Sequence, residues 1–183
     1  MTMDAFTLLE KDHRQVERLL EALGESEEGA ERQSLLQQLE VALTAHMQFE
    51  EQEVYPIVQR EMDAETAEEA GIEHGLAREG MAKMKELVAA PGFGAAVEMV
   101  KGGISHHVEE EEGEIFPALR KMVRGDQADT LRRALLDAKA AAGLPPLDLD
   151  GATKEELVEM AREMGVDITS SMTKEQVKAA LAG

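Results

Sequence analysis

The sequence lacks cysteine, has few aromatic residues and carries little positive charge. With no Cys in 183 residues, disulfides, zinc fingers and iron–sulfur clusters are excluded. Five aromatic residues, one Tyr and four Phe, are too few for a surface that stacks nucleic-acid bases. The 38 acidic and 19 basic residues give a net charge of −19, which repels phosphate backbones and anionic membranes. These features argue against nucleic acid as a partner.

Long apolar runs are also missing. None approaches the roughly 20 residues that span a bilayer. The first residues, Met-Thr-Met-Asp, lack the basic segment and apolar stretch of a signal peptide. We therefore expect a cytoplasmic protein with no membrane partner.

The chain is rich in strong helix formers, and its apolar residues recur at helical spacing. This pattern predicts five helices, over about residues 6–23, 30–60, 64–87, 94–123 and 126–142. Gly24 should end the first helix, Pro56 should kink or end the second, and Pro117 lies near the end of the fourth. Asp63 and Asp126 should cap the third and the fifth. No segment predicts a strand, so the fold class is all-α.

The C-terminal part reads as a separate small module. A Pro-rich stretch breaks the helical pattern, which suggests a main domain over residues 1–142, a linker over 143–151 and a two-helix module over 152–183. Thr153 with Glu156, and Thr173 with Gln176, form capping boxes that open two short helices, the first closed by Gly165. A module this small rarely folds alone, so it should lean on the main domain or on a partner.

An internal repeat is visible in the histidines. His13 and His74 are 61 residues apart, and so are His46 and His107. The surrounding residues shift by the same offset: His-x-x-x-Glu followed by an aromatic-Pro pair occurs at 46–56 and again at 107–117. The domain therefore consists of two copies of a helix pair, with one His on the first helix and His-x-x-x-Glu on the second.

This repeat predicts a metal site. Residues four apart share a helix face, so each His-x-x-x-Glu offers an imidazole and a carboxylate to one point. In an up-and-down four-helix bundle the helices converge on the core, where such groups are costly unless neutralised. Two cations would neutralise them, one held by His13 and His46 and the other by His74 and His107. Glu50 and Glu111 would bridge the two cations. A nitrogen and oxygen site without thiolate suits iron or manganese and also admits zinc.

The same residues resemble a known family. The doubled pattern His…His-x-x-x-Glu, with its aromatic-Pro pairs, is similar to the bacterial hemerythrin-like (HHE cation-binding) domain over about residues 1–142. The resemblance implies a four-helix bundle that holds a non-haem di-iron centre and handles dioxygen or related oxidants. It also implies that the iron ligands are His13, His46, Glu50, His74, His107 and Glu111. Oxygen-carrying hemerythrins have a further His where this chain has Arg78, so sensing, iron handling or peroxide chemistry gains weight over oxygen carriage.

Other residues near the motif are interpreted as lying outside the ligand set. His106 has Glu110 four residues on, but it aligns with Ala45 in the repeat and is interpreted as lying outside the ligand set, with a fifth-ligand role as the alternative. Tyr55 lies nine residues after His46, on the opposite helix face, and is interpreted as packing. Glu51 and Glu112 are reserve ligands. Gly102 and Gly103 allow either close helix packing or ligand access, and packing is the preferred interpretation.

The tail, from Leu149 through Val177, resembles the small N-terminal helical module of transcription termination factor Rho, which is related to SAP-type nucleic-acid-binding helices. Residues 148–183 carry a net charge of −4, which favours docking to a protein partner over nucleic-acid binding.

The leading hypothesis is therefore a di-iron protein that binds or reacts with O2, peroxide or NO in an oxygen, oxidative-stress or iron response. One alternative is a metal-dependent signalling module whose C-terminal helices dock a partner. Another is a catalase-like or peroxidase-like di-iron enzyme. The remaining alternative is a bundle without metal.

Overall fold

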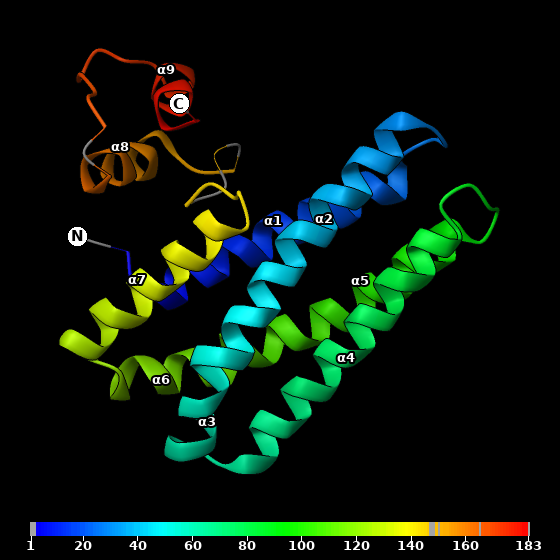
Figure 1. Cartoon of the computed structure of the whole chain (residues 1–183), viewed down its shortest axis with the longest axis horizontal. Helices are drawn as coiled ribbons and strands as arrows, with labels where there is room; N and C mark the ends of the chain where they lie inside the picture. The colour runs from blue at the N-terminus through cyan, green and yellow to red at the C-terminus, as the bar shows by residue number, and fades with distance from the viewer. Residues whose placement is uncertain (1–2, 147–148, 150, 165, 183) are drawn as a thin grey trace.

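The computed structural model describes residues 3–146, 149, 151–164 and 166–182, and these residues form helices and no strand. Four long helices make the up-and-down bundle that the sequence predicts (Figure 1). They are α1 (Ala5–Glu25), α2 (Ala30–Phe49), α4 (Ala64–Glu86) and α5 (Phe93–Glu110). Helix α1 packs against α2 and α5, and α4 packs against α5. No helix of the described ranges is long and apolar enough to cross a membrane.

The second and fourth predicted helices continue past Pro56 and Pro117, and their winding changes just before these prolines. After α2 the chain forms a π-helical segment, η1 (Glu50–Val54), and then α3 (Tyr55–Glu61). After α5 it forms η2 (Glu111–Ile115) and then α6 (Phe116–Met122). Each segment begins at the Glu of a His-x-x-x-Glu motif and ends just before the aromatic-Pro pair. The repeat is therefore a repeat of backbone geometry as well as of sequence.

The predicted helix ends are partly confirmed. Asp63 caps α4, with its Oδ1 accepting a hydrogen bond of 2.8 Å from the Thr66 amide. Two predictions were wrong. The first helix continues through Gly24 and ends at Glu25, since one glycine only weakens a helix. Asp126 is the first residue of α7 (Asp126–Ala141), not its cap, because Gly125, with φ of 59°, makes the turn before it.

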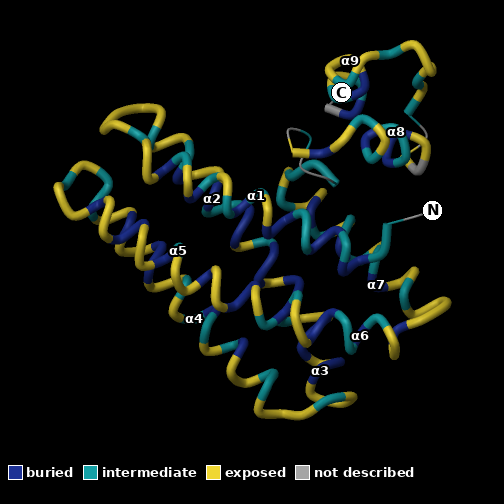
Figure 2. Tube along the Cα trace, turned by 180° about the vertical axis from the view of Figure 1, so that it is seen from behind, coloured by how far each residue is buried: buried dark blue, intermediate teal, exposed yellow. Residues whose placement is uncertain are grey.

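The core consists of two apolar clusters at opposite ends of the bundle. One lies toward the two hairpin loops and includes Leu20, Leu39 and Met84. The other lies toward α3, α6 and α7 and includes Leu8 and Phe116. In Figure 1 the two loops are at the same end of the bundle, and buried residues line the inward faces of the helices in Figure 2. The boundary between the clusters crosses α1 and α4 near their middle and α2 and α5 at their C-terminal ends.

The C-terminal helices pack against the bundle. Both predicted capping boxes are present, at the starts of α8 (Lys154–Glu163) and α9 (Lys174–Ala182). Leu157, Met160 and Val177 belong to the same apolar cluster as Leu8 of α1. Gly165, predicted to close α8, lies outside the described residues, as do Met1, Thr2, Leu147, Asp148, Asp150 and Gly183. The division at residues 142 and 152 stays a prediction.

Candidate metal centre

The structure brings the six predicted ligand residues together between the two apolar clusters. Each of the four long helices supplies one imidazole, and each π-helical segment supplies one carboxylate from its first residue. All six side chains are buried: the histidines are 2–7% exposed, and Glu50 and Glu111 are fully inaccessible. Two mixed His and Glu groups form here, each with donor atoms close enough to share one ion.

The imidazoles form two pairs. The Nε2 atoms of His13 and His46 are 3.1 Å apart, and those of His74 and His107 are 3.2 Å apart. Two nitrogens about 2.1 Å from one ion, at roughly a right angle, lie about 3.0 Å from each other. The observed separations therefore fit one ion for each pair.

Each carboxylate lies between the two pairs. Oε2 of Glu50 is 3.1 Å from Nε2 of His46 and 3.4 Å from Nε2 of His74. Oε2 of Glu111 is 3.3 Å from Nε2 of His13 and 3.5 Å from Nε2 of His107. A carboxylate that contacts one imidazole of each pair is placed to bridge two ions.

Buried carboxylate oxygens that lack hydrogen-bond partners also indicate a site for cations. Both carboxylate oxygens of Glu50 and Oε2 of Glu111 are buried without a hydrogen-bond partner. Burial opposes charge on Glu50 and His46, yet their mutual attraction holds the pKa of Glu50 well below its usual range and raises the pKa of His46 to about 10. Cations would satisfy these oxygens, which are otherwise expensive to bury. The residues present therefore fit a pair of metal ions.

A second layer of carboxylates holds the imidazoles from outside. Nδ1–H of His13 donates to Glu112 at 2.8 Å, that of His74 to Glu51 at 3.0 Å, and that of His107 to Glu73 at 2.8 Å. Such bonds fix the tautomer and leave the Nε2 lone pair facing the centre. The fourth imidazole differs, because Nδ1 of His46 has no hydrogen-bond partner and lies 4.0 Å from Oδ2 of Asp12.

Glu51 and Glu112 therefore contact imidazole Nδ1 atoms and do not reach the centre as reserve ligands. Glu73 was missed in this role. The signal was available, because Glu73 is the repeat counterpart of Asp12 and Glu112 that of Glu51. The repeat thus paired these carboxylates, but it did not show which atoms they contact.

Arg78 does not enter the site. Its guanidinium donates to Glu51 at 2.6 Å, on the outside of the bundle. Arg14 makes the same kind of ion pair with Glu112 in the other half. Arg78, at the position where oxygen-carrying hemerythrins have a further histidine, thus binds Glu51, the carboxylate that orients His74.

The interpretation of Tyr55 as packing on the opposite helix face was wrong. Its hydroxyl donates to Oε1 of Glu111 at 3.2 Å and lies 2.9 Å from Nε2 of His74. The cause is η1: an i→i+5 turn takes up one extra residue, so Tyr55 stands about 80° from His46 around the axis instead of about 180°. Burial, together with the carboxylates of Glu50 and Glu111, raises the pKa of the phenol. Its counterpart Phe116 stacks on the ring of His13, with the ring centroids 5.8 Å apart.

His106 lies outside the ligand group. Its side chain is 62% exposed and is 3.4 Å from Glu110 and 3.6 Å from Glu73. The register that places His107 inward turns the preceding residue away from the core.

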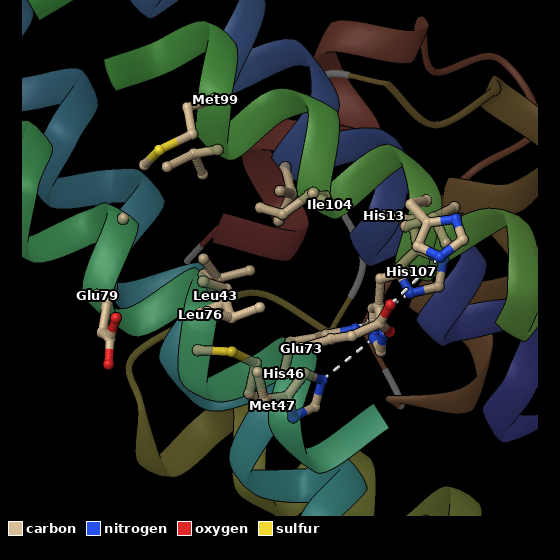
Figure 3. Close-up of a pocket in the computed structure, with 18 of the residues that line it drawn as sticks. His13, Leu43, His46, Met47, Glu73, Leu76, Glu79, Met99, Ile104 and His107 are labelled. Carbon is tan, nitrogen blue, oxygen red and sulfur yellow. Dashed lines mark hydrogen bonds and ion pairs between the residues drawn. The ribbon is translucent and has the colours of Figure 1, made fainter. Parts of the chain in front are cut away.

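A cavity of about 580 Å³ adjoins the imidazoles and is lined mainly by apolar residues of the four long helices. Figure 3 shows His46 and His107 near one end of it and Met99 and Glu79 toward the other. Gly103 lines the cavity, and a Cβ built there or on Gly102 would meet nothing within 4 Å. Close packing is therefore the wrong explanation for these glycines. Gly80 is the glycine that close packing requires, because its Cβ would lie 2.5 Å from Val100.

The fold and the site together define an all-α bundle with a buried, thiolate-free His and Glu site. The sequence matches the Hemerythrin HHE cation binding domain over residues 4–119, and the chain belongs to this family of metal-binding proteins. Comparison with curated proteins found no match.

Among solved structures, the chain resembles a hemerythrin HHE cation binding domain-containing protein from Mycobacterium kansasii. The TM-score is 0.66 at 18% identity, over 99% of this chain and 98% of that one. This likeness supports the fold, C-terminal helices included. The similarity of the tail to the Rho module stays a prediction.

Proposed function

We propose that this chain is a non-haem di-iron protein that binds or reacts with O2, peroxide or NO. In this proposal His13 and His46 would hold one iron, His74 and His107 would hold the other, and Glu50 and Glu111 would be shared by the two. The observation that carries the proposal is the convergence of four Nε2 atoms and two carboxylates with unmet oxygens in a buried centre. Six donor residues shared between two ions leave coordination positions for an external ligand.

Iron would supply the electrons for reducing an O–O bond or for holding a diatomic ligand. The residues of the chain supply the surroundings. Glu51, Glu73 and Glu112 accept the Nδ1–H bonds and keep three imidazoles oriented. The hydroxyl oxygen of Tyr55 lies 3.2 Å from Oε1 of Glu111, to which it donates, and would supply a proton to a ligand that gains negative charge at the centre. The cavity of about 580 Å³, which all four imidazoles line, would give small molecules access to them.

The proton on Tyr55 favours the peroxide-consuming enzyme among the alternatives. The signalling alternative is supported by a different contact, the ion pair between Lys11 of α1 and Glu156 of α8. Lys11 lies two residues before His13, so a change at the centre could reach the C-terminal helices. The partner of these helices, in that alternative, would be a protein.

The proposal is tested by metal content per chain and by the near-ultraviolet and visible spectrum of aerobically purified protein. Two irons per chain with oxo-bridge absorption are expected. His74→Ala should lower the iron content, whereas His106→Ala, on the exposed neighbour of His107, should leave it unchanged. Zinc or no metal, unchanged after anaerobic iron loading, would exclude the di-iron assignment. Repeated peroxide additions then separate the functions: an enzyme consumes many equivalents with its spectrum recovering, and a sensor does not.

A further inference from the structure

The two halves of the bundle treat equivalent grooves differently. In the first half, a groove between α1 and α2 contains a residual cavity of only about 10 Å³. Its bundle residues are Asp12, Gln15, Ala42, Ala45 and His46. In the second half, their counterparts 61 residues later all line the cavity of about 580 Å³, on its α4 and α5 side: Glu73, Leu76, Gly103, His106 and His107. These residues therefore form a groove equivalent to the first, and it opens into a cavity that residues of α1 and α2 also line.

The first groove is small because α7 fills it. Leu135 and Lys139, one turn apart on α7, complete its lining together with Leu144. Leu135 is almost fully buried, and Lys139, 4% exposed, makes an ion pair with Asp12. The occupant of this groove is therefore an amphipathic helix with an apolar anchor followed four residues later by a cation.

No helix of the described residues lies over the second groove. Its residues are smaller or more apolar than those of the first, so they are better suited to contact a covering helix. Two counterparts that line it are smaller: Val16 and Ala42 of the first half correspond to Ala77 and Gly103. Two others at its rim are apolar where the first half is polar, since Gln15 and Gln38 correspond to Leu76 and Met99. Ile72 of α4 likewise replaces Lys11 of α1.

These rim residues stand out on a highly charged molecule. Leu76 is 61% and Met99 is 60% exposed, and Ile72 lies one turn before Leu76 on α4. Of the five large apolar side chains found exposed in the described residues, Leu76 and Met99 line this groove. Contiguous exposed apolar residues beside a deep groove mark an interaction site.

We propose that the α4/α5 groove binds an amphipathic helix of a partner protein, seated as α7 is seated on α1 and α2. The partner places an apolar anchor over Ala77 and Gly103, and a Lys or Arg four residues later beside Glu73, the counterpart of Asp12. The extra depth takes an anchor larger than Leu135, such as an aromatic side chain.

Charge selects this occupant over a second copy of the chain. Glu73 and Glu79 line the groove, and Glu110 lies beside His106 at its edge. Lys83, the cation at the far end, pairs with Glu86 at 2.9 Å. An acidic groove on a chain of net charge −19 attracts a basic helix and repels another copy. Bound there, the helix would also cover the access to His74 and His107, a consequence that rests on the proposed function.

The experiment uses α7 itself as the probe. A synthetic peptide of residues 126–144 with Leu135→Trp is titrated with the full-length protein, whose own sequence has no Trp. Burial of the peptide's Trp shifts its fluorescence to shorter wavelength. The protein's own α7 keeps the first groove filled because its effective concentration is high. Binding is measured with and without metal, so the result does not depend on the di-iron proposal.

Variants identify the groove. Leu76→Gln with Met99→Gln restores the residues of the first half at two exposed positions and should weaken peptide binding tenfold or more. Met122→Gln, which removes an exposed Met elsewhere, is the matched control and should change nothing. A peptide that also carries Lys139→Glu should bind at least tenfold more weakly.

Several results would overturn the proposal. One is peptide binding that is insensitive to Leu76→Gln with Met99→Gln, and another is no binding at all. A dimer in sedimentation analysis that the double variant dissociates would assign the groove to a second copy instead. Binding of dodecanoate that the double variant abolishes, without peptide binding, would assign it to a lipid-like ligand.

Discussion

The buried ion pair between Lys139 and Asp12 allows a quantitative prediction. Both side chains lie in the interior, Lys139 4% and Asp12 7% exposed, and they join α7 to α1 across 127 residues of sequence. Burial opposes the charge of Asp12, but the attraction of Lys139 lowers the pKa of that carboxyl below its ordinary value. Lys139→Met keeps the length of the side chain and removes its charge, which leaves Asp12 without its cation.

Removing one partner of a buried pair costs about 3–5 kcal/mol. We expect the lower end, about 3 kcal/mol, because Asp12 can turn toward Nδ1–H of His46, only 4.0 Å from its Oδ2. With a urea dependence of about 2 kcal/mol per molar, the unfolding midpoint falls by about 1.5 M. The measurement is urea unfolding of the metal-free protein, so that metal affinity does not enter.

The control is Lys83→Met, the same substitution in the exposed pair with Glu86, which should cost no more than about 0.5 kcal/mol. Asp12→Asn combined with Lys139→Met removes both charges and should recover more than half of the loss. Equal losses for Lys139→Met and Lys83→Met would refute the reasoning. So would a double variant that is no more stable than Lys139→Met alone.

Three further predictions follow from the structure. Gly103→Ala should stabilise the protein by about 0.5–1 kcal/mol, because the new Cβ meets open space in a helix. Gly80→Ala should instead destabilise it by about 1–3 kcal/mol, because its Cβ would clash with Val100. Urea unfolding of the two variants measures both changes in the free energy of unfolding. Tyr55→Phe, which copies Phe116 of the other half, should lower the free energy of unfolding of metal-free protein by about 1.5–3 kcal/mol, because Oε1 of Glu111 loses its donor. Thermal unfolding that shows no such loss would contradict the observed hydrogen bond. Asp63→Ala should lower the melting temperature at pH 7, and the loss should shrink as the pH falls. Hydrogen bonds from the Thr66 amide and hydroxyl lower the pKa of Asp63 below its ordinary value, so its stabilisation is present at neutral pH and disappears as the pH falls through the folded-state pKa.

The sequence was sufficient for the bundle and for the convergence of six residues because both depend on local periodicity and on one repeat offset. Spacing of four residues determines which side chains share a helix face, and the offset of 61 pairs the halves. Tyr55 could not be placed in this way. Its angle depends on one extra residue per turn in η1, and no residue type in Glu50–Val54 announces that change.

The periodicity of the sequence also could not predict contacts between residues far apart in the chain. Nothing near Lys139 in the sequence indicates that it is buried, since a Lys on an amphipathic helix is ordinarily solvated. Its burial depends on where α7 lies against α1 and α2, which is a tertiary fact. The carboxylates around the imidazoles were an intermediate case. Their register was visible in the repeat, but only the fold shows that Glu51, Glu73 and Glu112 reach Nδ1 atoms and not the centre.

The departures from the repeat concentrate around the candidate centre and make its halves different. Beside the imidazole pair of His13 and His46 lie the apolar ring of Phe116 and an Asp12 that is bound to Lys139. Beside the pair of His74 and His107 lie the hydroxyl of Tyr55 and a Glu73 that is bound to His107. Helix α7 covers His46 on the side of Asp12, but all four imidazoles line the large cavity, so access does not distinguish the two pairs. The proton donor does distinguish them: with the proposed ligand assignment, the ion at His74 and His107 would lie beside the hydroxyl of Tyr55, and an external ligand that takes up a proton is expected to bind there first.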